Sequence, residues 1–296
     1  MKKHHLSIVG ILFLGYFITI LIGTILLLLP ISKNITEKSE WYDAMFAATS
    51  ATCVTGLIPF PTTNWSTFGQ IVLLVLIQIG GLGFMTIISL ILMMFKKNIG
   101  IYHRTVLMQS AGSYSISGVT NLIKRIILVT LFCEIVGAII LSLRFSSDME
   151  IGKAIYFGIF HSVSAFCNAG FDILGNNSMV PYVGNVWINL VICGLIIAGG
   201  LGFVVWIDLR LSLIHYREHF KYLESLSLHT KIALISTFVL IFGGMTVIFI
   251  LEFQNPLTLK SLPFSQKILA SFFQSVTLRT AGFATVDMAS LHQATK

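Results

Sequence analysis

The chain has 296 residues, of which 55% are hydrophobic and 10% charged, and its formal net charge is +7. Because a soluble domain carries roughly 25% charged residues, this composition excludes an ordinary soluble domain. The long, continuous apolar runs also exclude the alternating pattern of a membrane β-barrel. In a membrane chain the positive charge is typical of cytoplasmic loops that lie against membrane lipid, and it gives no reason to expect a nucleic-acid partner.

The first part of the chain predicts a helix, a short apolar segment that enters the membrane without crossing it (a dip), and a second helix. Residues 6–29 are long enough to cross a hydrocarbon core of about 30 Å. We interpret them as a retained membrane helix, because they are too long for a signal peptide and no small-residue cleavage site follows. Residues 43–52 are apolar but too few to cross, which predicts a re-entrant helix, and residues 68–95 are predicted to cross back.

The same order recurs along the rest of the chain. Residues 122–143 are predicted to span, residues 153–166 to dip and residues 186–207 to span; residues 232–251 then span and residues 268–278 dip. We expect an all-α integral membrane fold of repeated helix–re-entrant pore loop–helix units around a central pore. Residues 1–97 are predicted to form the first unit and residues 98–221 the second, with a cytoplasmic connection. Residues 222–296 are predicted to form a third unit of outer helix and pore loop only.

Each dip runs into a glycine. The three segments are Val54-Thr55-Gly56-Leu57, Asn168-Ala169-Gly170-Phe171 and Thr280-Ala281-Gly282-Phe283. A dehydrated alkali cation needs oxygen ligands, which backbone carbonyls supply, and glycine tolerates the positive φ needed to aim them. One such glycine is as readily an ordinary kink, but three copies after three short dips predict a selectivity filter.

The composition of these segments indicates the cargo. None of them contains a carboxylate, so the ring of Asp or Glu typical of a divalent-cation pore is missing. We expect a monovalent alkali cation as the transported ion. We expect no cofactor, no catalytic residue and no metal site beyond the transported ion in the filter.

A second repeated motif supports this assignment of spans and dips. The sequence Gly-Gly-Leu-Gly-Phe occurs at residues 80–84 and again at residues 199–203, each time in the helix that follows a dip. Glycines on a membrane helix allow a neighbouring backbone to approach closely. A dinucleotide-binding loop is excluded, because no strand precedes the motif and its spacing differs.

Basic residues predict the orientation. Eleven Lys and Arg residues fall on one predicted side of the membrane and six on the other. The excess marks the cytoplasmic side. We therefore expect a multi-pass protein of the cell membrane with a cytoplasmic N-terminus, in which all three dips enter from outside.

Three motifs carry a resemblance to a known family. They are ATCVTGL at residues 51–57, FCNAGF at residues 166–171 and RTAGF at residues 279–283. They resemble the first three filter segments of the Trk/Ktr/HKT potassium transporter superfamily, and within it those of the bacterial Ktr membrane subunits. The resemblance covers essentially the whole chain. It implies four units around one pore, a homodimer, a cytosolic nucleotide-binding regulatory subunit, and potassium uptake that is often linked to sodium.

The chain departs in two ways from the patterns that the resemblance implies. Where potassium channels have a second filter glycine, the chain has Ile58, Asp172 and Ala284, so a sodium or mixed monovalent cation transporter is the alternative. The sequence also stops before the third inner helix, and we expect a truncated product that lacks the fourth unit.

Two readings from other classes compete with transport. A polytopic membrane enzyme would need clustered ionisable residues at membrane depth, where the sequence offers only Glu134 and Arg279. A membrane scaffold would explain the hydrophobicity but not the three glycine segments. Glu134 itself is either a cation or proton site or the buried partner of a basic group, for which Arg279 is one possible residue.

Overall fold

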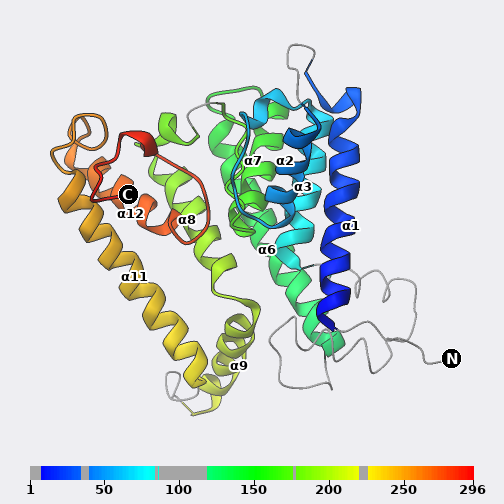
Figure 1. Cartoon of the computed structure of the whole chain (residues 1–296). Helices are drawn as coiled ribbons and strands as arrows, with labels where there is room; N and C mark the ends of the chain where they lie inside the picture. The colour runs from blue at the N-terminus through cyan, green and yellow to red at the C-terminus, as the bar shows by residue number, and fades with distance from the viewer. Residues whose placement is uncertain (1–7, 35–39, 84–85, 87–118, 176–177, 220–225) are drawn as a thin grey trace.

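The computed structural model describes residues 8–34, 40–83, 86, 119–175, 178–219 and 226–296 (Figure 1). Helices make up the regular structure of this part of the chain. The helices are α1 (Ile8–Leu28), α2 (Trp41–Thr52), α3 (Thr67–Leu82), α6 (Val119–Phe145), α7 (Ile151–Phe166), α8 (Val186–Gly200), α9 (Phe203–His219), α11 (Leu228–Glu252) and α12 (Phe264–Thr277).

The helices pack in three groups that follow the order of the chain. Helices α1, α2 and α3 contact one another, α6, α7 and α8 form a second group, and α11 packs on α12. Contacts of α3 with α7 and of α12 with α8 join the groups. The three short helices α2, α7 and α12 all lie in the upper half of Figure 1, which places the residues that follow them near one another.

Two helices match their predicted spans. Ile123–Phe145 in α6 and Leu228–Glu252 in α11 are long and apolar enough to cross a membrane. Their outward faces carry exposed apolar side chains such as Phe132, Leu143 and Ile250. This continuous apolar surface is typical of a face covered by lipid.

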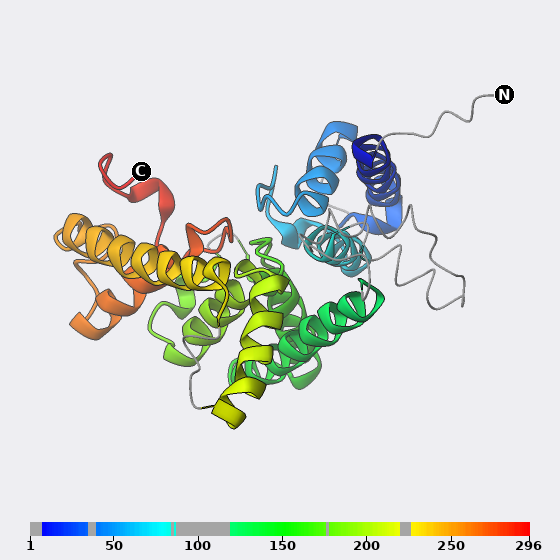
Figure 2. The same ribbon diagram turned by 90° about the horizontal axis from the view of Figure 1, so that it is seen from below.

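The predicted continuous span over residues 186–207 is wrong. Helices α8 and α9 meet at 94° at a short break. Gly202 in the break has a φ of +82°, a left-handed conformation that ends a helix. Seen nearly along the axes of α1 and α3, α9 lies across the view (Figure 2). In the first copy of the motif α3 ends at Leu82 and Gly83 has a φ of +80°; the rest of the predicted span 68–95, apart from Thr86, lies outside the described residues.

A buried carboxylate ties the end of α11 to the last part of the chain. Glu252 is fully buried and accepts hydrogen bonds from the side chains of Asn255 (2.6 Å), Thr258 (2.7 Å) and Thr295 (2.5 Å) and from the backbone N–H of His292 (2.9 Å). Four donors around one carboxylate compensate for its burial.

We expect Glu252→Gln to lower the free energy of unfolding by about 1.5–3 kcal/mol, because one carboxylate oxygen becomes a donor that faces other donors. Thermal unfolding of the purified protein in detergent measures the loss. Glu150→Gln is the matched control, since this exposed side chain makes no capping hydrogen bond. Equal melting temperatures for the two variants would contradict the role of Glu252.

Candidate ion pathway

Each short helix is followed by a residue with left-handed backbone, two residues before the glycine. These residues are Val54 (φ 55°), Asn168 (φ 56°) and Thr280 (φ 65°). After α2 and α7 the next backbone N–H donates to a carbonyl five residues back: Thr55 to Ser50 (2.9 Å) and Ala169 to Ser164 (2.8 Å). A left-handed residue with such a bond is a standard helix-terminating motif. After α12 the corresponding N–H of Ala281 donates four residues back, to Thr277 (2.9 Å). Val and Thr are β-branched and rarely adopt this conformation, so the ends of two of the three helices are strained.

The glycines two residues further on are also left-handed. The φ values are 83° at Gly56, 69° at Gly170 and 80° at Gly282. In an extended chain successive residues point to opposite sides, and reversing φ at every second residue turns successive carbonyls toward the same side. Glycine adopts this conformation without strain. The three segments therefore present backbone oxygens, which are the ligands that suit a dehydrated alkali cation.

The three glycines, far apart in the sequence, meet in space. A Cβ atom added at Gly170 would collide with the carbonyl oxygen of Ala281 and lie 2.6 Å from Cα of Gly282. A Cβ atom at Gly56 would lie 2.7 Å from the carbonyl oxygen of Ala169. The structure thus brings together the central residues of all three segments predicted from the sequence.

The residues after the glycines divide into two kinds. Phe171 and Phe283 are buried, each 1% exposed, and their carbonyls accept hydrogen bonds from Ser164 Oγ (2.7 Å) and Thr277 Oγ1 (2.6 Å). Leu57 is 60% exposed. In the first helix the hydroxyl of Ser50 is buried and makes no hydrogen bond to a described residue. The second and third segments are therefore anchored to their helices by a bond that the first segment lacks.

The glycine pairs of the repeated motif hold the short helices. A Cβ atom at Gly80 would collide with the carbonyl oxygen of Thr52, the last residue of α2. A Cβ atom at Gly199 would collide with the carbonyl oxygen of Phe166, the last residue of α7. These equivalent contacts are the close backbone approach that the motif predicted.

The second glycine of each pair lies close to a side chain of the next unit along the chain. A Cβ atom at Gly81 would collide with Cys167 Sγ. A Cβ atom at Gly200 would lie 3.1 Å from the side-chain amide of Asn168 in its own unit and 3.7 Å from Arg279 Nη2. Cys167 and Arg279 occupy the same position, three residues before their glycines. Each pair therefore contacts its own short helix and the following filter segment.

A cavity of about 380 Å³ lies between the two copies of the motif. Its lining includes Gly80, Gly83, Gly202 and Phe203. His229 is the single ionisable residue among the described residues that line it. Since Gly80 also contacts the end of α2, this cavity lies next to that helix end, on the side where α9 lies.

Glu134 does not have the partner that the sequence suggested. The carboxylate is 5% exposed and accepts two hydrogen bonds from the side-chain amide of Gln78 in α3, 3.0 and 3.2 Å long. Within the described part of the chain it forms no ion pair, so the predicted pairing with Arg279 is wrong. Arg279 lies near Gly200 instead. A glutamine inside a predicted span marks a polar side chain that needs a partner at membrane depth, but the sequence does not show which residue that partner is.

A family model decides what the chain is. The model named TrkH and described as a cation transport protein matches residues 13–296. The chain belongs to this family. The TrkH family is a family of cation transporters and not of enzymes, and the chain is a membrane protein.

Individual relatives agree with the family. The chain is 43% identical over 286 residues to the Ktr system potassium uptake protein B of Bacillus subtilis, covering 96% of this chain and 62% of the relative. It is 40% identical over 298 residues to the potassium/sodium uptake protein NtpJ of Enterococcus hirae, covering 99% and 64%. The chain thus spans less than two thirds of the length of these relatives.

A solved structure has the same fold. The crystal structure of the potassium transporter TrkH from Vibrio parahaemolyticus aligns with a TM-score of 0.69 at 17% identity, over 98% of this chain and 55% of that chain. The match supports the all-α membrane fold of re-entrant helices predicted from the sequence.

Proposed function

We propose that the chain forms the ion pathway of a system that takes up potassium across the cell membrane. The convergence of Gly56, Gly170 and Gly282, each with left-handed backbone, carries the proposal. Carbonyl oxygens without carboxylates suit a monovalent cation. The names of the two relatives, a potassium uptake protein and a potassium/sodium uptake protein, agree with this cargo.

The proposed filter consists of the three four-residue segments, one from each of three units. Its residues are Val54, Thr55, Gly56, Leu57, Asn168, Ala169, Gly170, Phe171, Thr280, Ala281, Gly282 and Phe283. The proposed units are residues 1–97, 98–221 and 222–296. The grouping of α1 with α2 and α3, of α6 with α7 and α8, and of α11 with α12 supports this division.

Sodium is the second candidate cargo. Each segment has one glycine where a potassium channel has two, and a relative at 40% identity is named as a potassium/sodium uptake protein. A filter with fewer aligned carbonyls holds an ion with fewer fixed ligands, which weakens discrimination by size. Sodium is then either co-transported or admitted in place of potassium.

We further propose a homodimer with a cytoplasmic N-terminus and a cytosolic nucleotide-binding regulatory subunit. The excess of Lys and Arg on one side of the chain supports the orientation. Light scattering of the purified full-length protein tests the dimer, and a mass of one subunit would overturn it. A labelled cysteine added at the N-terminus, reachable only from the cytoplasm, tests the orientation. Co-purification of a nucleotide-binding protein from the source cell tests the regulatory subunit.

Potassium uptake in cells that lack their own potassium systems tests the function. The cells express the full-length protein that contains this chain, or its Gly56→Ser variant, and external sodium is varied. Rescue by the wild type, with loss of potassium preference in the variant, is the expected result. Failure of the wild type to rescue, with the protein present in the membrane, would overturn the proposal.

The side-chain anchors of the second and third segments give a further prediction. We expect Ser164→Ala to lower potassium uptake about tenfold, because the carbonyl of Phe171 loses its hydrogen bond and a small displacement of filter ligands has a large effect on selectivity and rate. Ser50→Ala is the matched control at the equivalent helix position, and its uptake should stay unchanged since its hydroxyl has no described partner. Uptake assays at equal membrane levels distinguish the two.

A further inference from the structure

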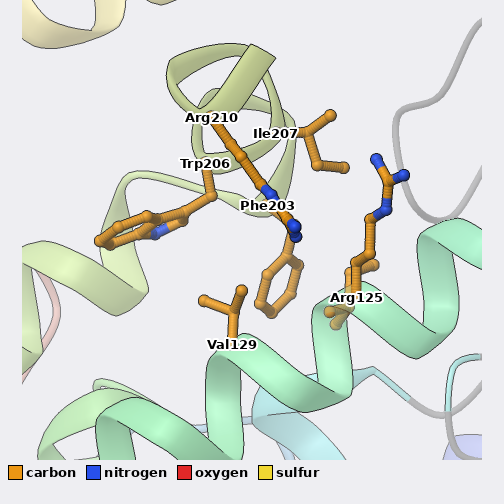
Figure 3. Close-up of a pocket in the computed structure, with 7 residues that line it drawn as sticks. Arg125, Val129, Phe203, Trp206, Ile207 and Arg210 are labelled. Carbon is orange, nitrogen blue, oxygen red and sulfur yellow. The ribbon is translucent and has the colours of Figure 1, made fainter. Parts of the chain in front are cut away.

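A narrow crevice separates α6 from α9 at the end of α6 that lies away from the three glycines. Arg125 and Val129 of α6 line one side, and Phe203, Trp206, Ile207 and Arg210 of α9 line the other (Figure 3). Arg125 extends up from α6 and Arg210 comes down from α9, so two guanidinium groups enter the crevice from different helices. The proposed filter does not use either residue.

The charges of the crevice are not balanced within the described part of the chain. Both arginines are exposed, and neither forms an ion pair with another described residue. Asp208, the acidic residue nearest to Arg210 in sequence, accepts hydrogen bonds from the backbone N–H (2.9 Å) and the hydroxyl (2.8 Å) of Ser227. Two like charges in one crevice repel each other, and an anion between them relieves the repulsion.

The shape of the crevice restricts the kind of anion. Its volume is about 20 Å³, which has room for roughly one water molecule, so a free organic anion cannot be enclosed. A ligand must lie across the mouth and on the apolar side chains of Val129, Phe203 and Ile207. The indole of Trp206 is fixed beside them, because its Nε1 donates to the carbonyl of Ala198 (2.9 Å).

We propose that Arg125 and Arg210 hold the phosphate of an anionic phospholipid whose acyl chain lies on this apolar surface. Guanidinium groups bind phosphate oxygens in pairs of hydrogen bonds. Basic pockets between membrane helices on the cytoplasmic side are typical sites for such head groups. The excess of basic residues places the crevice on that side.

The bound lipid fixes α9 against α6. Helix α9 follows the bend at Gly202, and Phe203 lines both the crevice and the cavity next to the glycine motif. A lipid that bridges Arg125 and Arg210 therefore stabilises one angle of the bend. This inference does not depend on which cation is carried.

Native mass spectrometry of the purified full-length protein tests the site with phosphatidylglycerol and phosphatidylcholine of equal chain length. We expect wild type to bind phosphatidylglycerol at least about tenfold more tightly. Each of Arg125→Gln and Arg210→Gln should lose about fivefold, and the double variant about 25-fold. Lys124→Gln removes the same charge from the same helix outside the crevice, and it should stay within about twofold. Raising the salt concentration with wild-type protein should also weaken the binding.

Two results would overturn the proposal. One is an unchanged affinity for phosphatidylglycerol in the double variant, which would place the lipid elsewhere. The other is inorganic phosphate displacing the lipid at an equal concentration, which would make the crevice a site for small anions. Lipid binding is read directly, so a failure here is distinguishable from a failure to transport potassium.

Discussion

Gly170→Ala is expected to reduce potassium uptake by about a hundredfold while the protein still reaches the membrane. The added methyl group would collide with the carbonyl oxygen of Ala281 and lie 2.6 Å from Cα of Gly282. Both are backbone atoms, so no side chain can move aside to relieve the contact. The φ of 69° adds strain, because alanine rarely adopts left-handed backbone. A displacement of the filter oxygens by up to about 1 Å is enough to lower uptake by about this factor.

The three glycines are expected to differ in sensitivity. A Cβ atom at Gly56 would meet the nearest backbone oxygen at 2.7 Å, and one at Gly282 would lie 3.1 Å from Cα of Gly170. Uptake should therefore fall most for Gly170→Ala, less for Gly56→Ala and least for Gly282→Ala. Gly243→Ala is the control for an added methyl group, since nothing lies within 4 Å of that position. Equal losses at all three glycines would show that backbone conformation, and not contact between the segments, decides the effect.

Much of the fold follows from local signals in the sequence. The predicted dips at 43–52, 153–166 and 268–278 correspond to α2, α7 and α12 because each apolar run is short and ends at a left-handed residue before its glycine. The predicted span 186–207 failed for a related reason. Hydrophobicity alone cannot show that Gly202 adopts a positive φ and bends the chain by 94°.

The candidate site was predictable only in part. The repeated glycines identified the segments that meet, since the same pattern occurred three times. The partner of Glu134 was not predictable, because Gln78 lies in a different unit and the contact depends on how α3 packs beside α6. The anchors at Ser164 and Thr277 were missed for the same reason. A serine in an apolar helix is common, and its bond to a carbonyl beyond the turn shows only in three dimensions.

Gly199→Ala is expected to lower the melting temperature of the protein and also its uptake. The methyl group would collide with the carbonyl oxygen of Phe166 and lie 3.5 Å from its Cα, so α8 or the end of α7 must shift. Overpacking of this kind costs about 1–3 kcal/mol, and more where backbone is the obstacle. The displaced end of α7 carries Asn168 and Gly170 with it, so stability and transport should fall together.

A matched variant on α8 distinguishes the loss caused by the contact with Phe166 from the general effect of replacing a glycine. Nothing lies within 4 Å of a Cβ atom at Gly194, so Gly194→Ala should be neutral or stabilise α8 by about 0.5–1 kcal/mol, because alanine loses less backbone freedom on folding. Gly80→Ala, which meets Thr52 as Gly199 meets Phe166, should behave like Gly199→Ala. If Gly199→Ala and Gly194→Ala melt at the same temperature, the glycine pairs do not hold the short helices. If Gly80→Ala and Gly199→Ala both lower the melting temperature while Gly194→Ala does not, the equivalent contacts in the two units act alike. Each contact then fixes the end of the helix that positions a filter segment.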